Sequence, residues 1–303
     1  MATPPRKTAA DFDPDVLRLF DQYVHGQIDR RGFLSGAARF AVGATTAAGL
    51  LAALSPQFAM AQQVKPDDAR LRASYLQFAS PQGYGTGQGY LVRPANPTGP
   101  LPTVLVVHEN RGLNPHIEDV ARRLALENFL VFAPDALFPL GGYPGDEDKA
   151  RSVFTKLDQT KTRQDFLAAA RLLHGMAGGN RQLGVVGFCY GGAISNFLAT
   201  QLSELKAAAP FYGSAPPVED VPNIKAEVLV VLAGNDERVN AGWPPYKEEL
   251  EKAGVRHALL QPPGTQHGFH NDTTPRYDEA AAREAWARTL DLFERTLRQP
   301  QAA

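Results

Sequence analysis

A regular alternation of short apolar runs with helix-patterned segments is the feature that most constrains the fold of this chain. After residue 100, the predicted strands are Thr103–Val107, Phe129–Ala133, Leu183–Phe188, Ala207–Tyr212, Val228–Ala233 and His257–Leu260. The segments with helical spacing are Ile117–Leu126, Arg163–Met176, Ala193–Leu202, Tyr246–Ala253 and Glu279–Leu297. Strands that are apolar on both faces and separated by helices form a mostly parallel sheet with helices on both sides.

Two earlier segments predict an antiparallel pair at the start of the sheet. They are Ser74–Phe78 and Gly89–Val92, and the glycine-rich stretch Pro81–Gly89 between them favours a turn. No internal repeat and no second boundary is visible after residue 62. The pattern therefore predicts a single α/β domain over residues 62–303.

The composition excludes several classes of function. The chain has a formal net charge of −1 and no basic stripe, so we expect no nucleic-acid partner. It contains a single cysteine, Cys189, which rules out an intramolecular disulfide. No Cys-x-x-Cys motif or histidine-rich cluster is present, so we predict no metal site and no cofactor.

The first 61 residues are a different kind of sequence. Paired arginines at 30–31, an uncharged apolar run at 41–54 and an Ala-Met-Ala triplet at 59–61 follow one another in that order. This arrangement resembles a twin-arginine export signal with a cleavage site. We therefore predict that residues 1–61 are a leader, that the twin-arginine export machinery is a partner, and that the protein is periplasmic or secreted.

Two alternatives to a cleaved leader stay open. The segment can be an amphipathic or core N-terminal helix, or an uncleaved membrane anchor. Without processing of the leader, the protein would be cytoplasmic or membrane-anchored. The apolar run has fourteen residues, and about 20 are needed to span a bilayer. A short helix is expected around Pro14–Tyr23, with no assigned purpose.

The strongest chemical signal surrounds Cys189. The predicted strand Leu183–Phe188 runs into Gly-Phe-Cys-Tyr-Gly at residues 187–191, and a helix follows. Strand, Gly-x-nucleophile-x-Gly, helix is the nucleophile elbow of the α/β-hydrolase fold. The start of the helix directs free N–H groups and its positive dipole end at the thiol, which lowers the thiol pKa. We predict that Cys189 is a nucleophile; the alternative is a buried cysteine in a tight turn.

An acid and a histidine follow the nucleophile in the order that this fold requires. Asp236 lies just past the predicted strand Val228–Ala233, with Glu237 as its neighbouring competitor. His267 lies in the loop before the last helix and precedes a glycine, and His270 is its competitor. We predict that Asp236 orients His267 and that His267 is the base.

The loop after the first parallel strand supplies further candidates. An oxyanion hole needs one backbone N–H after the nucleophile and one from an early loop. These would be the N–H groups of Tyr190 and Asn110. Arg111 is a candidate for substrate binding, or else a solvated loop charge.

Taken together, these residues resemble the dienelactone hydrolase family over about residues 75–297. The motifs that carry the resemblance are Val-Val-His-Glu-Asn-Arg-Gly-Leu-Asn at 106–114, Ala-Pro-Asp at 133–135, Gly-Phe-Cys-Tyr-Gly-Gly at 187–192, Asp236 and His-Gly-Phe at 267–269. The resemblance implies a triad of Cys189, His267 and Asp236. It also implies that Glu109 contacts the resting thiol and helps to activate it.

One position departs from the family pattern. Members that cleave dienelactones carry an arginine shortly after the catalytic histidine, whereas this chain has Asn271 there, and Arg276 or Arg151 would have to substitute. We therefore predict hydrolysis of a small ester or lactone, dienelactone-like, through a thioester. The alternatives are a thioesterase or other acyl hydrolase of the same fold, or a non-catalytic binding protein. The oligomeric state is not predicted.

Overall fold

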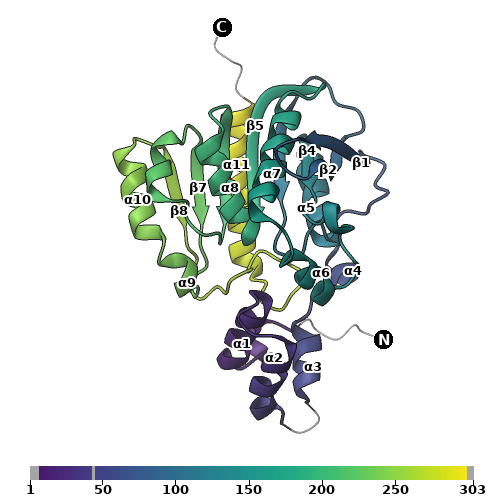
Figure 1. The fold of residues 1–303 in the computed structure, drawn as a ribbon, viewed down its shortest axis with the longest axis vertical. Coiled ribbons are helices and arrows are strands. Elements are labelled where there is room, and N and C mark those ends of the chain that lie inside the picture. The colour runs from purple at the N-terminus through teal and green to yellow at the C-terminus, as the bar shows by residue number, and fades with distance from the viewer. Residues whose placement is uncertain (1–6, 43–44, 299–303) are drawn as a thin grey trace.

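An eight-stranded sheet forms the centre of the molecule (Figure 1). The computed structural model describes residues 7–42 and 45–298. The strand order is β1-β2-β4-β3-β5-β6-β7-β8. The strands are β1 (Leu71–Ser80), β2 (Gly85–Pro94), β3 (Leu101–Val107), β4 (Leu130–Pro134), β5 (Gly179–Phe188), β6 (Leu205–Phe211), β7 (Glu227–Val231) and β8 (His257–Leu260).

The predicted α/β-hydrolase fold, with an antiparallel opening pair, is confirmed. β1 pairs antiparallel with β2, and β2 pairs antiparallel with β4. From β4 through β3 to β8, every neighbouring pair is parallel. All residues of β3 are buried. Its side chains alternate between two apolar clusters, so that Leu105 and Val107 face one and Val104 and Val106 the other.

Helices cover both faces of this sheet. Helices α7 (Gln159–His174), α8 (Tyr190–Gln201) and α10 (Trp243–Lys252) contribute to one cluster. Helices α5 (Pro115–Leu126) and α11 (Glu279–Leu297) contribute to the other. The domain also contains α6 (Glu147–Phe154), α9 (Glu237–Asn240) and two 3-10 turns, η3 (Phe138–Leu140) and η4 (Val218–Asn223).

Helices α6 and α8 have weak local sequence patterns for helix formation. Helix α6, which contains the candidate Arg151, is a polar segment with one fully buried side chain, Ala150, so its apolar periodicity is weak. Helix α8 begins at Tyr190 rather than at Ala193. Its first turn contains Gly191 and Gly192, which have low helix propensity. Tertiary packing keeps them helical, because both lie directly against backbone of other segments.

Residues 7–42 and 45–61 form a small helical unit against the end of the sheet (Figure 1). The expected helix around Pro14–Tyr23 is present as α1 (Pro14–Val24). The unit also contains α2 (Arg30–Ala37), α3 (Ala47–Leu54), α4 (Phe58–Ala61) and the 3-10 turns η1 (Ala9–Asp11) and η2 (Ala38–Phe40). Its apolar cluster is separate from those of the sheet.

The role of this segment as a leader and the boundary at residue 61 stay predictions. Residues 1–6, residues 43–44 within the apolar run 41–54, and residues 299–303 lie outside the described residues. Within the described part of the chain, no helix is long and apolar enough to cross a membrane.

Candidate active site

Cys189 occupies a sharp turn between β5 and α8. Its φ of 55° and ψ of −111° lie in a region that non-glycine residues rarely adopt. A Cβ on Gly187 would lie 2.0 Å from the carbonyl oxygen of Gly191, and a Cβ on Gly191 would lie 2.2 Å from that of Val107. The backbone N–H of Cys189 donates to the carbonyl of Phe211 at 2.9 Å. Only glycine therefore fits on either side of the cysteine, as the Gly-x-Cys-x-Gly motif requires.

Two histidines control the charge of this thiol. Burial by itself would raise the pKa of Cys189, but the positive charges of His267 and His25, together with the hydrogen bond to the His25 ring, lower it to about 5. A thiol with that pKa is a thiolate at neutral pH, which is the nucleophilic form.

Asp236 and His267 meet at the carboxyl end of the sheet. Nδ1 of His267 lies 2.5 Å from Oδ2 of Asp236, and both side chains are buried. Burial raises the pKa of Asp236, but the hydrogen bond and the charge of His267 lower it by more, so that the pKa lies below its usual value. Burial lowers the pKa of His267, but Cys189 and Asp236 raise it, with a net increase. The contact therefore favours the charged form of each group, and the hydrogen bond to Asp236 fixes the orientation of the His267 ring.

The two competitors of this pair lie elsewhere. Glu237 is exposed at the start of α9. His270 is buried and stacks on Phe188 and Trp286, with ring centroids 5.2 and 5.6 Å apart. The geometry favours Asp236 and His267 over both.

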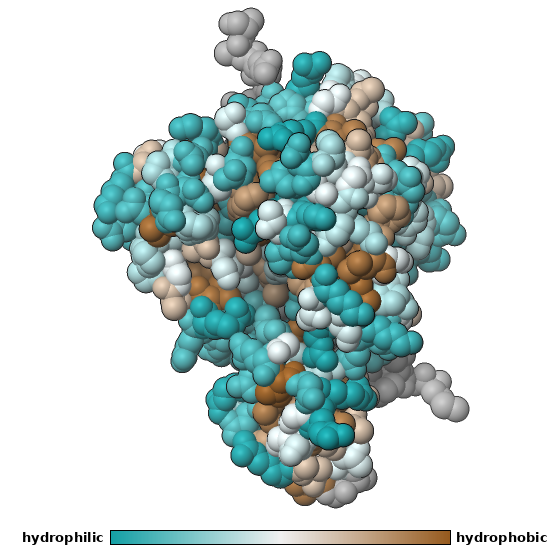
Figure 2. Space-filling model, viewed as in Figure 1, coloured by the Kyte–Doolittle hydropathy of each residue, from teal (hydrophilic) through white to brown (hydrophobic). Residues whose placement is uncertain are grey.

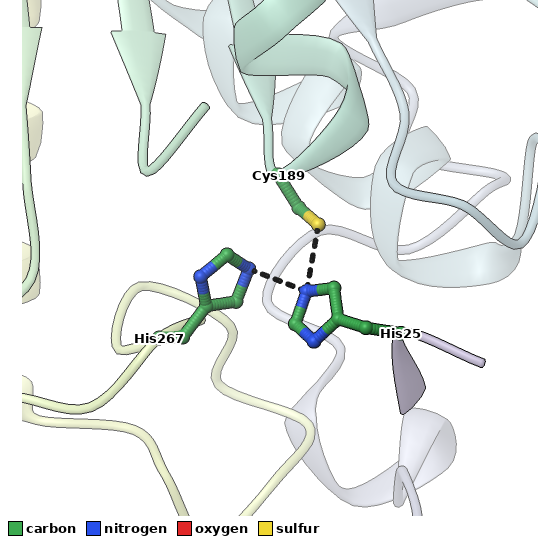
Figure 3. A group of neighbouring side chains, drawn as sticks. All are labelled: His25, Cys189 and His267. Carbon is green, nitrogen blue, oxygen red and sulfur yellow. Dashed lines mark hydrogen bonds between the residues drawn. The ribbon is translucent and has the colours of Figure 1, made fainter. Parts of the chain in front are cut away.

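His25 is a site residue that the sequence analysis missed. It follows α1, and its Nε2 lies 3.5 Å from Sγ of Cys189 and 3.2 Å from Nε2 of His267 (Figure 3). Its Nδ1 lies 2.8 Å from the carbonyl of Asp21. Burial lowers the pKa of His25, but Asp21 and Cys189 raise it to about 10. Sequence reasoning assigned this residue to the leader, and no local motif marks it, because its site partners are more than 160 residues away.

The loop after β3 lines a cavity at the thiol of Cys189. Glu109, the residue predicted to activate the thiol, accepts a hydrogen bond from Nδ2 of Asn271 at 3.1 Å. Asn271 stands where family members that cleave dienelactones have an arginine. Nδ2 of Asn110 donates to the carbonyl of Val24 at 2.9 Å. Arg111 is buried, with Nε 3.6 Å from a carboxylate oxygen of Glu147, so it is not a solvated loop charge.

The predicted backbone donors belong to this region as well. Tyr190 is the first residue of α8, where N–H groups have no acceptor within the helix. Asn110 and Cys189 both line the cavity. The role of the Tyr190 and Asn110 N–H groups as oxyanion donors stays a prediction.

The cavity at the thiol is small. Its volume is about 50 Å³. The lining from the N-terminal unit includes Phe20, Tyr23, Val24 and His25, and the lining from the domain includes Glu109, Asn110, Arg111, Cys189, His267, Asn271 and Arg276. Both proposed substitutes for the missing arginine contact the N-terminal unit. Arg276 lies 3.8 Å from Oδ1 of Asp21, and Arg151 stacks on the ring of Tyr23.

His25, Cys189 and His267 also have the donor set that zinc prefers. One ligand atom from each lies within 4.8 Å of the others. However, Nη2 of Arg238 lies 3.3 Å from Nε2 of His25. A metal ion bound by the three side chains would have to displace this guanidinium from Nε2 of His25.

Comparisons with known proteins agree with this architecture. The model of the dienelactone hydrolase family matches residues 88–297, and a model described as YqhI-like matches residues 3–42. "Putative carboxymethylenebutenolidase" of Escherichia coli K12 is 30% identical over 266 residues, which cover 82% of this chain and 96% of the relative. "Putative hydrolase fragment YghX" of the same organism is 50% identical over 115 residues, covering 38% of this chain and 98% of the fragment.

A solved structure extends the comparison to three dimensions. The crystal structure of a "Putative Dienelactone Hydrolase" from Klebsiella pneumoniae superposes with a TM-score of 0.64 at 28% identity. The match covers 73% of this chain and 98% of that one. This chain therefore belongs to the dienelactone hydrolase family and is a hydrolase with the α/β-hydrolase fold.

Proposed function

We propose that the protein hydrolyses a small ester or lactone with Cys189 as nucleophile, His267 as base and Asp236 as the residue that orients the base. One observation carries this proposal: a thiol with a pKa of about 5 lies on a strained elbow beside a buried His267–Asp236 pair. Strained backbone at a nucleophile and a shifted thiol pKa are both typical of catalytic sites.

The reaction would proceed in two steps. The Cys189 thiolate attacks the carbonyl carbon, and the resulting tetrahedral adduct expels the alkoxide as the thioester forms. Protonated His267 gives its proton to the leaving oxygen. Neutral His267 then removes a proton from water, which attacks the thioester, and the acid and the thiolate are released. Asp236 keeps the Nδ1–H of His267 fixed, so that Nε2 faces the reacting atoms.

Backbone amides would stabilise the oxyanion in both steps. Tyr190 contributes an N–H at the positive end of α8, and Asn110 contributes one from the loop after β3. Glu109 would help to activate the thiol when substrate binds. In the described structure its carboxylate is held by Asn271 at 3.1 Å.

The acyl group is expected to carry a negative charge. Arg111 and Arg276 line the cavity and are buried, and neither charge is fully compensated by a close carboxylate. A buried guanidinium pairs well with a substrate carboxylate. A carboxylate-bearing lactone therefore fits the site better than a neutral ester.

The decisive experiment is Cys189→Ala assayed on a panel of aryl esters, lactones and acyl thioesters. We expect a loss of roughly 10⁴-fold in kcat/KM, and a thioester adduct on Cys189 by mass spectrometry of the parent enzyme. Full activity of Cys189→Ala would refute the assignment. A preference for thioesters would change the assigned substrate class but would leave Cys189 as the nucleophile.

We also propose export by the twin-arginine machinery, which rests on the sequence pattern at 30–31, 41–54 and 59–61. This pathway carries folded proteins, so α1 and α2 would have to leave the domain for the signal to be read. The N-terminal mass of the protein recovered from periplasm and cytoplasm of an expressing bacterium tests this proposal. An intact N-terminus confined to the cytoplasm would refute it.

A further inference from the structure

The carboxyl end of α1 fills the mouth of the active site. The last turn of a helix presents carbonyl groups without intrahelical partners and carries the negative end of the helix dipole. Here the carbonyl of Val24 accepts from Asn110 at 2.9 Å and from Arg111 at 3.2 Å, and the carbonyl of Tyr23 accepts from Arg151. The carbonyl groups at the end of α1 therefore bind two arginines of the domain, Arg111 and Arg151.

A carboxylate of α1 lies beside the remaining arginine. Oδ1 of Asp21 lies 3.8 Å from Nη1 of Arg276, which is too far for a hydrogen bond. Arg276 is only 9% exposed, and its Nε and Nη1 have no hydrogen-bond partner among the described residues. Such a buried guanidinium can take a closer anionic partner than Asp21.

His25 occupies the place where a substrate would react. Its Nε2 is 3.5 Å from the thiolate and 3.2 Å from Nε2 of His267, the atom that has to exchange protons during hydrolysis. The cavity that remains is about 50 Å³. Small-molecule sites are usually about 300–1,000 Å³. An ester therefore reaches Cys189 only after α1 has moved away.

The N-terminal unit is built to move as a body. Its apolar cluster, which includes Phe20, Phe33 and Leu54, is separate from the clusters of the domain. Its contacts with the domain are mainly polar, such as the ion pair of Arg30 with Asp148 at 2.7 Å. On the face drawn in Figure 2, hydrophilic residues predominate at the junction between the unit and the domain, beside a small hydrophobic patch. A polar junction between two separate cores permits relative motion.

We infer that α1 and His25 form an intramolecular inhibitor that imitates an anionic substrate. The helix end and Asp21 occupy the arginines that would bind the substrate carboxylate, and His25 is the counter-ion of the thiolate. The enzyme is latent in this form and becomes active when the N-terminal unit is displaced or removed. This inference rests on the proposed function for its activity readout, but the accessibility of the thiol tests it independently.

The experiment uses the full chain with two variants and one control. Asp21→Lys places a positive charge against Arg276, and His25→Ala removes the ring that covers the thiolate. Gln22→Lys introduces the same side chain at an adjacent, exposed position. The rate of Cys189 alkylation by iodoacetamide is measured at pH 8, together with kcat/KM for an aryl ester and a carboxylate-bearing lactone. Thermal unfolding checks that each variant is folded.

We expect at least a tenfold rise in alkylation rate and in kcat/KM for Asp21→Lys and His25→Ala, and no change for Gln22→Lys. Faster alkylation without any hydrolysis of esters or lactones would support the inhibitory role of α1 and His25 but refute the proposed function. Unchanged alkylation in both variants would overturn the inhibitor. A loss of activity in His25→Ala would overturn it as well, because His25 would then assist catalysis.

Discussion

Nε2 of His25 lies 3.5 Å from Sγ of Cys189, although 164 residues separate the two in the chain. This contact brings the N-terminal helix into the centre of a hydrolase site. The thiolate consequently has two imidazoles beside it, one from the domain and one from the N-terminal unit (Figure 3).

Asp236→Asn should lower kcat by roughly 10³–10⁴-fold, because an amide no longer fixes the Nδ1–H tautomer of His267. Glu237→Gln is the matched control, since it removes a neighbouring carboxylate that is exposed and should leave kcat unchanged. Steady-state kinetics on the best substrate of the panel measures both. Equal effects of the two variants would contradict the orienting role of Asp236.

The alkylation of Cys189 should depend on pH with a midpoint near 5, the value to which the neighbouring histidines lower its pKa. The iodoacetamide rate of the full chain is expected to be flat between pH 6 and 8 and to fall below pH 5, because the thiolate becomes protonated. Mass spectrometry at a series of pH values gives the profile. A rate that still rises steeply between pH 7 and 8 would show an ordinary thiol.

His270 should make the fold sensitive to acid. Burial lowers its pKa from 6.5 to about 3, so the unfolded chain binds a proton that the folded protein excludes. The corresponding stability is present above about pH 6.5 and is lost progressively as the pH falls towards 3. The free energy of unfolding, from urea titrations between pH 7 and 4, should decline less in His270→Gln. If the free energy of unfolding declined equally in the parent protein and in His270→Gln, the acid sensitivity would belong to other groups.

Gly191→Ala should destabilise the protein by about 3 kcal/mol or prevent folding, because overpacking against backbone cannot be relieved by a rotamer change. The added Cβ would lie 2.2 Å from the carbonyl oxygen of Val107. Gly99→Ala is the control, since nothing lies within 4 Å of its Cβ position. Similar midpoints of thermal unfolding for both variants would mean that the elbow tolerates a side chain.

In the His25→Ala background, where the site is expected to be open, Arg276→Gln should raise KM for a carboxylate-bearing lactone by roughly tenfold and leave KM for a neutral aryl ester unchanged. The reason is that a charge-assisted hydrogen bond to the carboxylate is lost while the reacting groups are retained. Both substrates are assayed with the same enzyme preparation. Equal effects on the two substrates would assign Arg276 to the structure of the loop rather than to substrate binding.

The sequence by itself determined the parts of this protein that depend on local pattern. Periodicity predicted the parallel sheet and its helices, because strands and helices bury their faces with different repeats. The motif around Cys189 predicted the elbow, since only glycines fit beside that backbone conformation. Chain order then favoured Asp236 and His267, and the structure brings these two side chains together at 2.5 Å.

The tertiary structure alone decided what closes the site. The helix α1 was visible as a pattern, but the docking of its carboxyl end on Arg111 and Arg151 was not. These contacts join polar groups that are far apart in the chain, and no local periodicity encodes them. For the same reason the sequence pattern places His25 in a leader, whereas the fold places Nε2 of its ring 3.5 Å from Sγ of Cys189.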